Sequence, residues 1–262
     1  MPELDYIVEN RVAWIRLNRP AQKNAFTLAM IDAWSARLGE AQGDPDVGAV
    51  VVTGNGDGFC AGVDLSVIEE MAQKPSALAW KSLLMDRVHK VALTLERMDK
   101  PVIAAVNGVA VGAGMDMALM CDMRFAARSA RFSEGYIRIG AVPGDGGCYY
   151  LPRLVGTAKA LELLLSGAFV DAPEALRIGL VNRVFEDTEL IEGVREFAVG
   201  LASQSPVAVR MIKRAVYQSE RCDLRTSLDL ISSHMGIVQT TDDSREALEA
   251  FRQGRPSRFE GR

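Results

Sequence analysis

One short stretch of the chain places a carboxylate among glycines, and it is the first candidate for chemistry. Asp145 lies within Gly144–Gly147, directly after Pro143, in the sequence VPGDGGCYYLPRLVG. Two interpretations compete. Asp145 either hydrogen-bonds to the amides of its own turn, as aspartate often does, or a tight backbone holds it toward a substrate as a proton donor and acceptor.

Two glycine-containing segments have the pattern of backbone anion sites. FCAGVDL begins at Phe59 and GAGMDM begins at Gly112, and each follows an apolar run and leads into a helical pattern. Such turns direct backbone N–H groups toward one point, and the start of a helix adds partial positive charge. Two convergent N–H groups would form an oxyanion hole, which stabilises a developing enolate. The alternative is that each segment is only a turn.

Other classes of site lack their motifs. The dinucleotide fingerprint G-x-G-x-x-G is incomplete at both places where it could begin. After Gly54 and Gly56 the third glycine is replaced by Phe59, and after Gly112 and Gly114 it is replaced by Met117. The two histidines, His89 and His234, have no G-x-S-x-G elbow beside them, so we interpret them as packed or surface residues. The four cysteines are far apart, which predicts buried thiols in a reducing compartment rather than disulfides or a zinc site. We expect no metal.

Size and charge narrow the function further. The chain has 262 residues, of which 48% are hydrophobic, so it can bury a substantial core. Its 30 basic and 34 acidic side chains give a net charge of -4, which favours neither nucleic acid nor an anionic membrane as partner. The acidic N-terminal stretch and the lack of an apolar run of about 18 residues predict a cytoplasmic protein.

The hydrophobic patterns predict an α/β fold. Strands are expected at residues 6–8 and 12–17, joined at Asn10 and Arg11, and a helix follows with Thr27 as its cap. Apolar runs such as VGAVVVTG, PVIAAVNG and MRFAA alternate with helical regions at residues 76–98 and 112–120, which indicates βαβ crossovers. Residues 1–188 are therefore expected to form the core. Residues 189–262 are expected to form a helical subdomain with helices near 189–203, 206–220, 223–238 and 241–253.

The segments also resemble a known family. LNRPAQKNAF, FCAGVDL, KPVIAAVNGVAVGAGMDMALMCDMRFAA, VPGDGGCYYLPRLVG and FRQGRPSRF occur in the order seen in the crotonase superfamily, which includes the enoyl-CoA hydratases and isomerases. The resemblance covers essentially the whole chain. It implies a spiral of ββα turns, a helical C-terminal region for assembly into trimers or dimers of trimers, and an acyl-CoA substrate. It implies no separate cofactor, since coenzyme A is part of that substrate.

The resemblance also assigns roles to the motif residues. The backbone N–H groups of Ala61 and Ala113 are expected to form the oxyanion hole, and Asp116 takes the place of the first catalytic glutamate. Tyr136 stands where hydratases have the second glutamate, and its usual pKa near 10 makes it a poor base. An aromatic residue there is similar to an isomerase branch in which an aspartate of the glycine loop moves the proton, and Asp145 is one residue from that position.

Two further interpretations concern this region. The ring of Tyr136 can form the wall of the acyl pocket, with its hydroxyl as a secondary contact. Glu134 is expected on the same strand face two residues earlier, where it is a substitute carboxylate ranked below Asp116 and Asp145.

The coenzyme A end of the ligand is expected to lie near several other positions. Basic side chains would contact the phosphates, backbone groups after the first glycine segment would hold the adenine, and C-terminal aromatic residues would lie close to the ligand or to a subunit contact. These residues are Arg19, Lys23, Gly62, Asp64, Leu65, Phe251 and Phe259.

The favoured function is therefore an acyl-CoA enzyme of the enoyl-CoA hydratase/isomerase type. The oxyanion hole would hold the enolate oxygen while Asp116, Asp145 or both relay a proton. Two alternatives stay open. Asp145 can instead act as a nucleophile, as in an aryl-CoA dehalogenase or hydrolase, or the chain can be a noncatalytic homologue that binds acyl-CoA or RNA.

Overall fold

Two β-sheets form the centre of the fold in the computed structural model, which describes residues 2–73 and 76–262. The larger sheet has the order β1-β2-β3-β5-β7-β10, in which β1 and β2 are antiparallel and the other neighbours are parallel. Its strands are β1 (Leu4–Glu9), β2 (Val12–Leu17), β3 (Ala49–Gly54), β5 (Val102–Val106), β7 (Met123–Ala127) and β10 (Arg183–Phe185).

The predicted N-terminal hairpin is confirmed. Asn10 and Arg11 join β1 to β2 with φ values of 51° and 64°, the left-handed backbone that a two-residue hairpin loop requires. The strand β3 is buried along its whole length, as its near-continuous valine run predicts for a parallel strand covered on both faces.

The smaller sheet shows how the chain spirals. Its order is β4-β6-β8-β9, formed by β4 (Gly58–Cys60), β6 (Val109–Val111), β8 (Arg131–Ser133) and β9 (Val170–Asp171). The strands β3, β5 and β7 of the larger sheet are each followed directly by β4, β6 and β8 of the smaller one, and then by helical structure. The expected spiral of ββα turns is thereby confirmed.

Helices cover the sheets. The helix α1 (Leu28–Gly43) begins after Thr27, whose Oγ1 accepts a hydrogen bond from the amide of Met30 at 3.1 Å, as predicted. The long helix expected near residues 76–98 contains a π-helical turn, η2 (Leu84–Val88), between α3 (Ala77–Leu83) and α4 (Lys90–Arg97). Further helical segments are η1 (Pro20–Gln22), α2 (Leu65–Gln73), α5 (Ala113–Leu119), η3 (Gly135–Ile139), α6 (Gly147–Val155), α7 (Thr157–Ser166) and α8 (Ala172–Arg177). Among the helices described here, none is long and apolar enough to cross a membrane.

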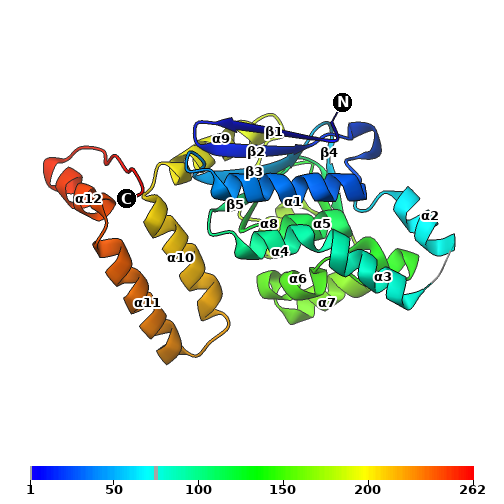
Figure 1. The fold of residues 1–262 in the computed structure, drawn as a ribbon. Coiled ribbons are helices and arrows are strands. Elements are labelled where there is room, and N and C mark those ends of the chain that lie inside the picture. Colours follow the sequence, from blue (N-terminus) through cyan, green and yellow to red (C-terminus); the bar gives the residue numbers. More distant parts are fainter. Residues whose placement is uncertain (1, 74–75) are drawn as a thin grey trace.

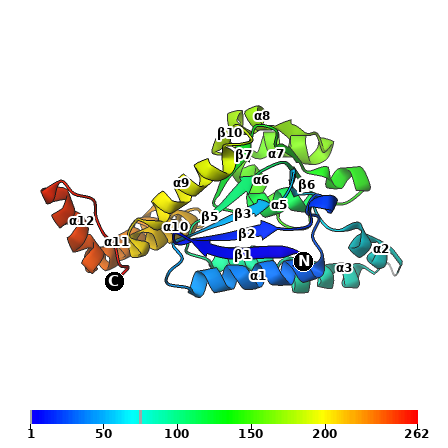
Figure 2. The ribbon, with the colours of Figure 1, turned by 90° about the horizontal axis from the view of Figure 1, so that it is seen from above.

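The four predicted C-terminal helices are present. They are α9 (Leu190–Ala202), α10 (Pro206–Ser219), α11 (Leu224–Gln239) and α12 (Asp242–Gln253). Pro206 is the first residue of α10 and Asp223 caps α11, as predicted. The helix α9 packs on the larger sheet, whereas α10, α11 and α12 extend away from it at the end opposite α2 and α3 (Figures 1 and 2).

The cysteine environments differ in part from the prediction. All four cysteines are free, and Cys60 and Cys121 are buried. Cys148 is exposed and Cys222 is half-buried, so the expectation of four buried thiols was wrong for these two. Cys148 follows the first residue of α6, where its side chain leaves the protein interior.

Candidate active site

A tyrosine hydroxyl joins two aspartates at the centre of the candidate site. Oη of Tyr136 lies 2.7 Å from Oδ2 of Asp116 and 3.0 Å from Oδ2 of Asp145. The three side chains come from η3, α5 and the loop before α6, so the fold brings together the three residues singled out in the sequence. Because a hydroxyl has one hydrogen, it donates to only one carboxylate. The other aspartate must carry a proton to complete its own bond.

Two glycines determine the position of Asp116 beside Tyr136. Gly112 has a φ of 52° immediately before α5, a conformation that side chains disfavour. A methyl group on Gly114 would overlap the carbonyl of Cys60, so only glycine lets α5 start this close to the end of β4. The fourth residue of the helix, Asp116, is then fully buried.

The loop that carries Asp145 is fixed by a hydrogen bond before Asp145 and by two glycines after it. Nε2 of His89 lies 2.7 Å from the carbonyl oxygen of Gly144, which fixes the residue before Asp145. Gly146 has a φ of 119°, and a methyl group on Gly147 would overlap Oδ1 of Asp116. The glycines around Asp145 therefore turn the backbone toward Asp116 and leave room for its carboxylate.

Burial controls the acidity of the cluster. Asp116 is 0% exposed and Asp145 is 6% exposed. Burial raises the pKa of Asp116, although its hydrogen bond from Tyr136 opposes this shift. Burial likewise raises the pKa of Asp145, and Tyr136 and His89 lower it in part. The pKa of Tyr136 is raised by burial and by both aspartates, so its hydroxyl keeps its proton. Both aspartates are thereby moved toward the neutral range, where a carboxyl group can donate and accept protons.

Glu134 belongs to the same cluster but not to the strand expected for it. Glu134 follows β8 and is the residue before the 3-10 helix η3, which carries Tyr136. The expected shared strand face was therefore wrong. The tight helical turn nevertheless directs both side chains inward, and Glu134 is 1% exposed beside Asp116.

The structure corrects the expected role of Ala61 as an oxyanion donor, because its N–H group already has an acceptor. Its N–H donates to the carbonyl of Lys23 at 2.9 Å, so it is not free for a ligand, and the residue itself is exposed. Within the described residues the amide of Val63, two positions later, has no hydrogen-bond acceptor. The amide of Ala113, the first residue of α5, is also free of an intrahelical partner.

Gly62 brings these two free amides close together. It has a φ of 99°, and a methyl group placed on it would lie 3.6 Å from the amide nitrogen of Ala113. The two segments identified in the sequence thus meet, with Val63 rather than Ala61 as the available donor. The sequence alone does not show which amide of the motif already donates a hydrogen bond to another segment of the protein.

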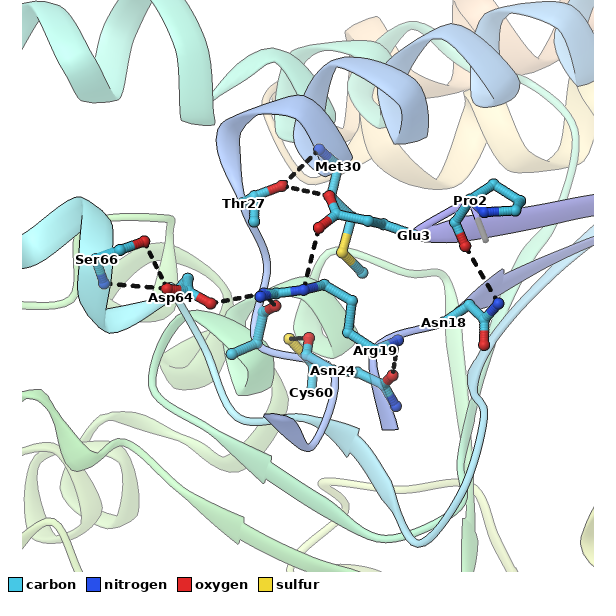
Figure 3. Close-up of polar contacts among 11 residues, drawn as sticks. Pro2, Glu3, Asn18, Arg19, Asn24, Thr27, Met30, Cys60, Asp64 and Ser66 are labelled. Atoms are coloured by element: carbon cyan, nitrogen blue, oxygen red, sulfur yellow. Dashed lines mark hydrogen bonds and ion pairs between the residues drawn. The ribbon is translucent and has the colours of Figure 1, made fainter. Parts of the chain in front are cut away.

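Arg19 forms hydrogen bonds and ion pairs with other residues of the protein. Nη1 of Arg19 donates to Oδ2 of Asp64 at 2.7 Å and to the carbonyl of Ala25, and its Nε pairs with Glu3 at 3.1 Å (Figure 3). Asp64 also accepts hydrogen bonds from the amide and hydroxyl of Ser66, which together with Arg19 lower its pKa to about 2. Two carboxylates thus already neutralise the charge of Arg19, and its expected phosphate contact stays a prediction.

The other expected ligand contacts have mixed outcomes. Lys23 pairs with Asp57, and its side chain is 47% exposed, so it stays accessible at the surface. Leu65 is 71% exposed at the start of α2. Phe251 is on α12, and Phe259 lines a cavity of about 750 Å³ beside α10. The helix α12, which carries Phe251, lies at the end of the molecule away from α5, which carries Asp116 (Figure 1).

No metal site accompanies the cluster in the described ranges, 2–73 and 76–262, where no group of three His, Cys, Asp or Glu side chains could hold an ion.

Comparison with known proteins identifies the family. The sequence profile described as enoyl-CoA hydratase/isomerase matches residues 8–262. The chain belongs to the enoyl-CoA hydratase/isomerase family. It is 39% identical to the short-chain-enoyl-CoA hydratase of Clostridium acetobutylicum, over 93% of this chain and 92% of that one. It is 37% identical to the 2,3-dehydroadipyl-CoA hydratase of Escherichia coli over the full length of both.

Solved structures of the enoyl-CoA hydratase/isomerase family agree with this fold. The chain superimposes on the enoyl-CoA hydratase of Bacillus anthracis with a TM-score of 0.93 and 33% identity, over 100% of both chains. The resemblance found in the sequence is thereby confirmed, and the protein is an enzyme of the enoyl-CoA hydratase/isomerase type.

Proposed function

We propose that this enzyme moves the double bond of an enoyl-CoA thioester between the 3-enoyl and 2-enoyl positions. One observation carries the proposal: the Tyr136 hydroxyl lies between Oδ2 of Asp116 and Oδ2 of Asp145. A 1,3-shift of a double bond needs one group that removes a proton and another that returns it. Two carboxyl groups that share one proton through a hydroxyl supply both.

The first step forms a dienolate. The ionised aspartate removes a proton from C2 of the 3-enoyl thioester, and the electron pair of the broken C–H bond moves toward the thioester carbonyl. The resulting negative oxygen accepts hydrogen bonds from the free amides of Val63 and Ala113. Fixed donors at this place are worth about 10²–10³ in rate each, because they need no reorganisation as charge develops.

The second step returns a proton to C4. The protonated aspartate donates to C4, and the double bond forms between C2 and C3. The Tyr136 hydroxyl then passes a proton from one carboxyl group to the other, which restores the starting state. One proton leaves the substrate and one returns, so the reaction consumes no water and needs no separate cofactor.

Hydration is the second candidate, because the relatives from Clostridium acetobutylicum and Escherichia coli are named hydratases. In that reaction the same amides would hold the enolate of a 2-enoyl thioester. Asp116 and Asp145 would position water and return its proton to C2. The tyrosine at position 136 disfavours this route, because burial and the aspartates raise its pKa and prevent it from acting as a base.

The two candidates are separated by incubating 2-enoyl-CoA and 3-enoyl-CoA thioesters in D₂O with the wild type, Asp116→Asn and Asp145→Asn. Isomerisation predicts deuterium at C2 or C4 with no added water mass, lost by about 10²–10⁴ in both variants. A 3-hydroxyacyl product that depends on Asp116 alone would establish hydration and exclude the relay. A covalent adduct on Asp145 would instead establish the nucleophilic, dehalogenase-like alternative.

For coenzyme A binding we propose that Lys23 contacts the phosphates, since it is the accessible one of the two expected cations. We also propose that backbone groups near Gly62 and Leu65 hold the adenine end, and Leu65 is 71% exposed and thus accessible there. Lys23→Ala should raise KM for the thioester several-fold while kcat stays within about twofold, because an exposed charge contributes about 1 kcal/mol or less.

We also propose that the chain assembles into trimers or dimers of trimers. The C-terminal helices expose large apolar side chains, including Ile212, Val216, Leu224, Leu228, Met235 and Phe251. Exposed apolar side chains repeated along α10, α11 and α12 favour an interface on these helices. Sedimentation should give about three or six times the chain mass, and a monomer at micromolar concentration would contradict the proposal.

The free thiols and the coenzyme A ligand support a cytoplasmic location, which we propose as well. The net charge of -4 supports a protein without a nucleic-acid partner. Titration with RNA at low salt tests the noncatalytic alternative, since saturable binding there would restore it.

A further inference from the structure

A third carboxyl group lies behind the two aspartates, and the proposed reaction does not use it. Glu134 is 1% exposed, and neither of its carboxyl oxygens has a hydrogen-bond donor among the described residues. Oδ1 of Asp116 also lacks a donor there. Unsatisfied carboxyl oxygens are costly in a protein interior, so each such atom needs an explanation.

The unsatisfied oxygens face one another. A methyl group placed on Gly147 would overlap Oδ1 of Asp116, and it would lie 2.9 Å and 3.0 Å from the two oxygens of Glu134. All three atoms therefore surround the same small space on one side of Gly147. Ionised carboxylates only accept hydrogen bonds, so two of them cannot satisfy each other. A single proton between them resolves the conflict, because a protonated carboxyl group donates.

We propose that Glu134 is a positioning residue that stays protonated and donates its hydrogen to Oδ1 of Asp116, which leaves Oδ2 of Asp116 to Tyr136. Both oxygens of Asp116 then have fixed partners. The carboxyl plane of Asp116 is held in one orientation, and its negative charge is stabilised without a buried cation. The catalytic effect of this contact rests on the proposed function, whereas the protonation of Glu134 does not.

The charges around Glu134 support a neutral form. Asp116 approaches it from α5, Asp145 from the loop before α6 and Tyr136 from η3, while Cys148 on α6 is a further acidic group nearby. The ring of His89 lowers the pKa of Asp145 instead. Burial first, and then the negative charge of Asp116, raise the pKa of Glu134. Neutral Glu134 is thus the form that this environment favours through the neutral range.

The contact from Glu134 determines which carboxyl groups of the cluster carry a proton. If Glu134 donates to Asp116 and Tyr136 donates to Asp116, then Asp145 carries the proton that it donates to Oη of Tyr136. Asp116 is the single carboxylate of the resting site and the base of the first step. Asp145 is the acid of the second step. The contact from Glu134 therefore sets the direction in which the relay starts.

The test uses Glu134→Gln and Glu134→Leu in the full chain. Glutamine has the same shape and keeps a donor for Asp116, but it has no titrating proton. Leucine fills the space and removes the donor. Infrared spectra of the substrate-free protein near pH 8 should show the carbonyl stretches of two protonated carboxyl groups, Glu134 and Asp145, in the wild type. Glu134→Gln should lose one of these two bands and keep the other. This readout does not require activity.

Kinetics then test the positioning role. Loss of a hydrogen bond to a charged group predicts that kcat of Glu134→Leu falls about tenfold to a hundredfold, with the acidic limb of its pH–rate profile moved to higher pH. Glu134→Gln should restore most of that loss and keep the acidic limb in place. The alkaline loss of activity that comes from ionisation of Glu134 should disappear in this variant.

Other outcomes overturn the proposal. Identical infrared spectra for the wild type and Glu134→Gln would show that Glu134 is ionised. A Glu134→Leu enzyme with the wild-type pH profile would remove the positioning role, whatever its stability. If Glu134→Gln loses one carboxyl band but the wild type isomerises no thioester, the protonation of Glu134 stands and the proposed function fails instead.

Discussion

The carbonyl oxygen of Gly144 accepts a hydrogen bond from Nε2 of His89 over 2.7 Å. His89 lies between the π-helical turn η2 and α4, and Gly144 directly precedes Asp145. One contact thus connects the helical layer that covers the site with the loop that carries the proposed acid. The ring nitrogen must hold a hydrogen, because a carbonyl oxygen can only accept.

His89→Ala should lower kcat by about tenfold, because loss of one hydrogen bond releases the loop and lets Asp145 leave Tyr136. Steady-state rates on the preferred thioester measure the effect. The control is His234→Ala on α11, which removes the other histidine of the chain far from the cluster. Equal rates for His89→Ala and wild type would show that Asp145 does not need this tether.

Tyr136→Phe should keep the fold and interrupt the relay. The ring lies about 3.7 Å from the position of a methyl group on Gly112, and phenylalanine retains this packing. Without the hydroxyl, Asp116 can still remove a proton, but it cannot exchange one with Asp145. Isomerisation should fall by about 10²-fold or more, whereas exchange of the C2 hydrogen in D₂O should fall much less. Parallel loss of both rates would contradict a relay role for the hydroxyl.

The sequence predicted most of the fold because its signals are local. The left-handed turn at Asn10, the cap at Thr27 and the first residue of α10 at Pro206 each depend on neighbours within a few positions. The short strands of the smaller sheet were not predicted. Strands such as β9, with two residues, contain too few residues for an alternating pattern, and their partners are distant in the chain.

The site was predictable as a set of residues but not as a set of contacts. Asp116, Tyr136 and Asp145 were identified from their motifs, and the fold brings them together. The free amide was placed on Ala61 instead of Val63, because only the tertiary structure shows that Lys23 already accepts from Ala61. The ion pairs of Arg19 were likewise not predicted, since its acidic partners come from distant segments (Figure 3).

Asp116→Asn should stabilise the protein while it removes activity. The folded-state pKa of Asp116 is raised by burial above the value of the unfolded chain, about 3.9. The folded protein therefore holds an extra proton as pH rises from about 4 toward neutrality, and stability is lost through that window at up to about 1.4 kcal/mol per pH unit. Asparagine has no such proton. Urea unfolding at several pH values should show an advantage of the variant that grows with pH, and a constant difference would contradict the raised pKa.

Gly62→Ala tests the oxyanion hole through the backbone. Alanine is strained at a φ of 99°, and its methyl group would lie 3.0 Å from the carbonyl of Val111 beside the amide of Ala113. The two segments must move apart, so kcat should fall by about 10²–10³, as for the loss of one donor. Binding of a saturated acyl-CoA, measured by calorimetry, should weaken much less. A larger effect on this affinity than on kcat would indicate that the free amides serve binding rather than enolate stabilisation.

Gly147→Ala separates the requirements of the carboxyl cluster from those of helix formation. Gly147 is the first residue of α6, and alanine is the better helix former by about 1 kcal/mol. Its methyl group would, however, overlap Oδ1 of Asp116 and crowd Glu134, so the carboxyl groups must separate. We expect loss of at least about 10²-fold in kcat, since a displaced proton carrier no longer meets its partner.

Gly200→Ala in α9, where nothing lies within 4 Å of the added methyl group, is the matched control. It should raise the free energy of unfolding by about 0.5–1 kcal/mol and leave kcat unchanged. Full activity of Gly147→Ala would mean that Asp116 does not need the contact geometry on which the proposed relay depends.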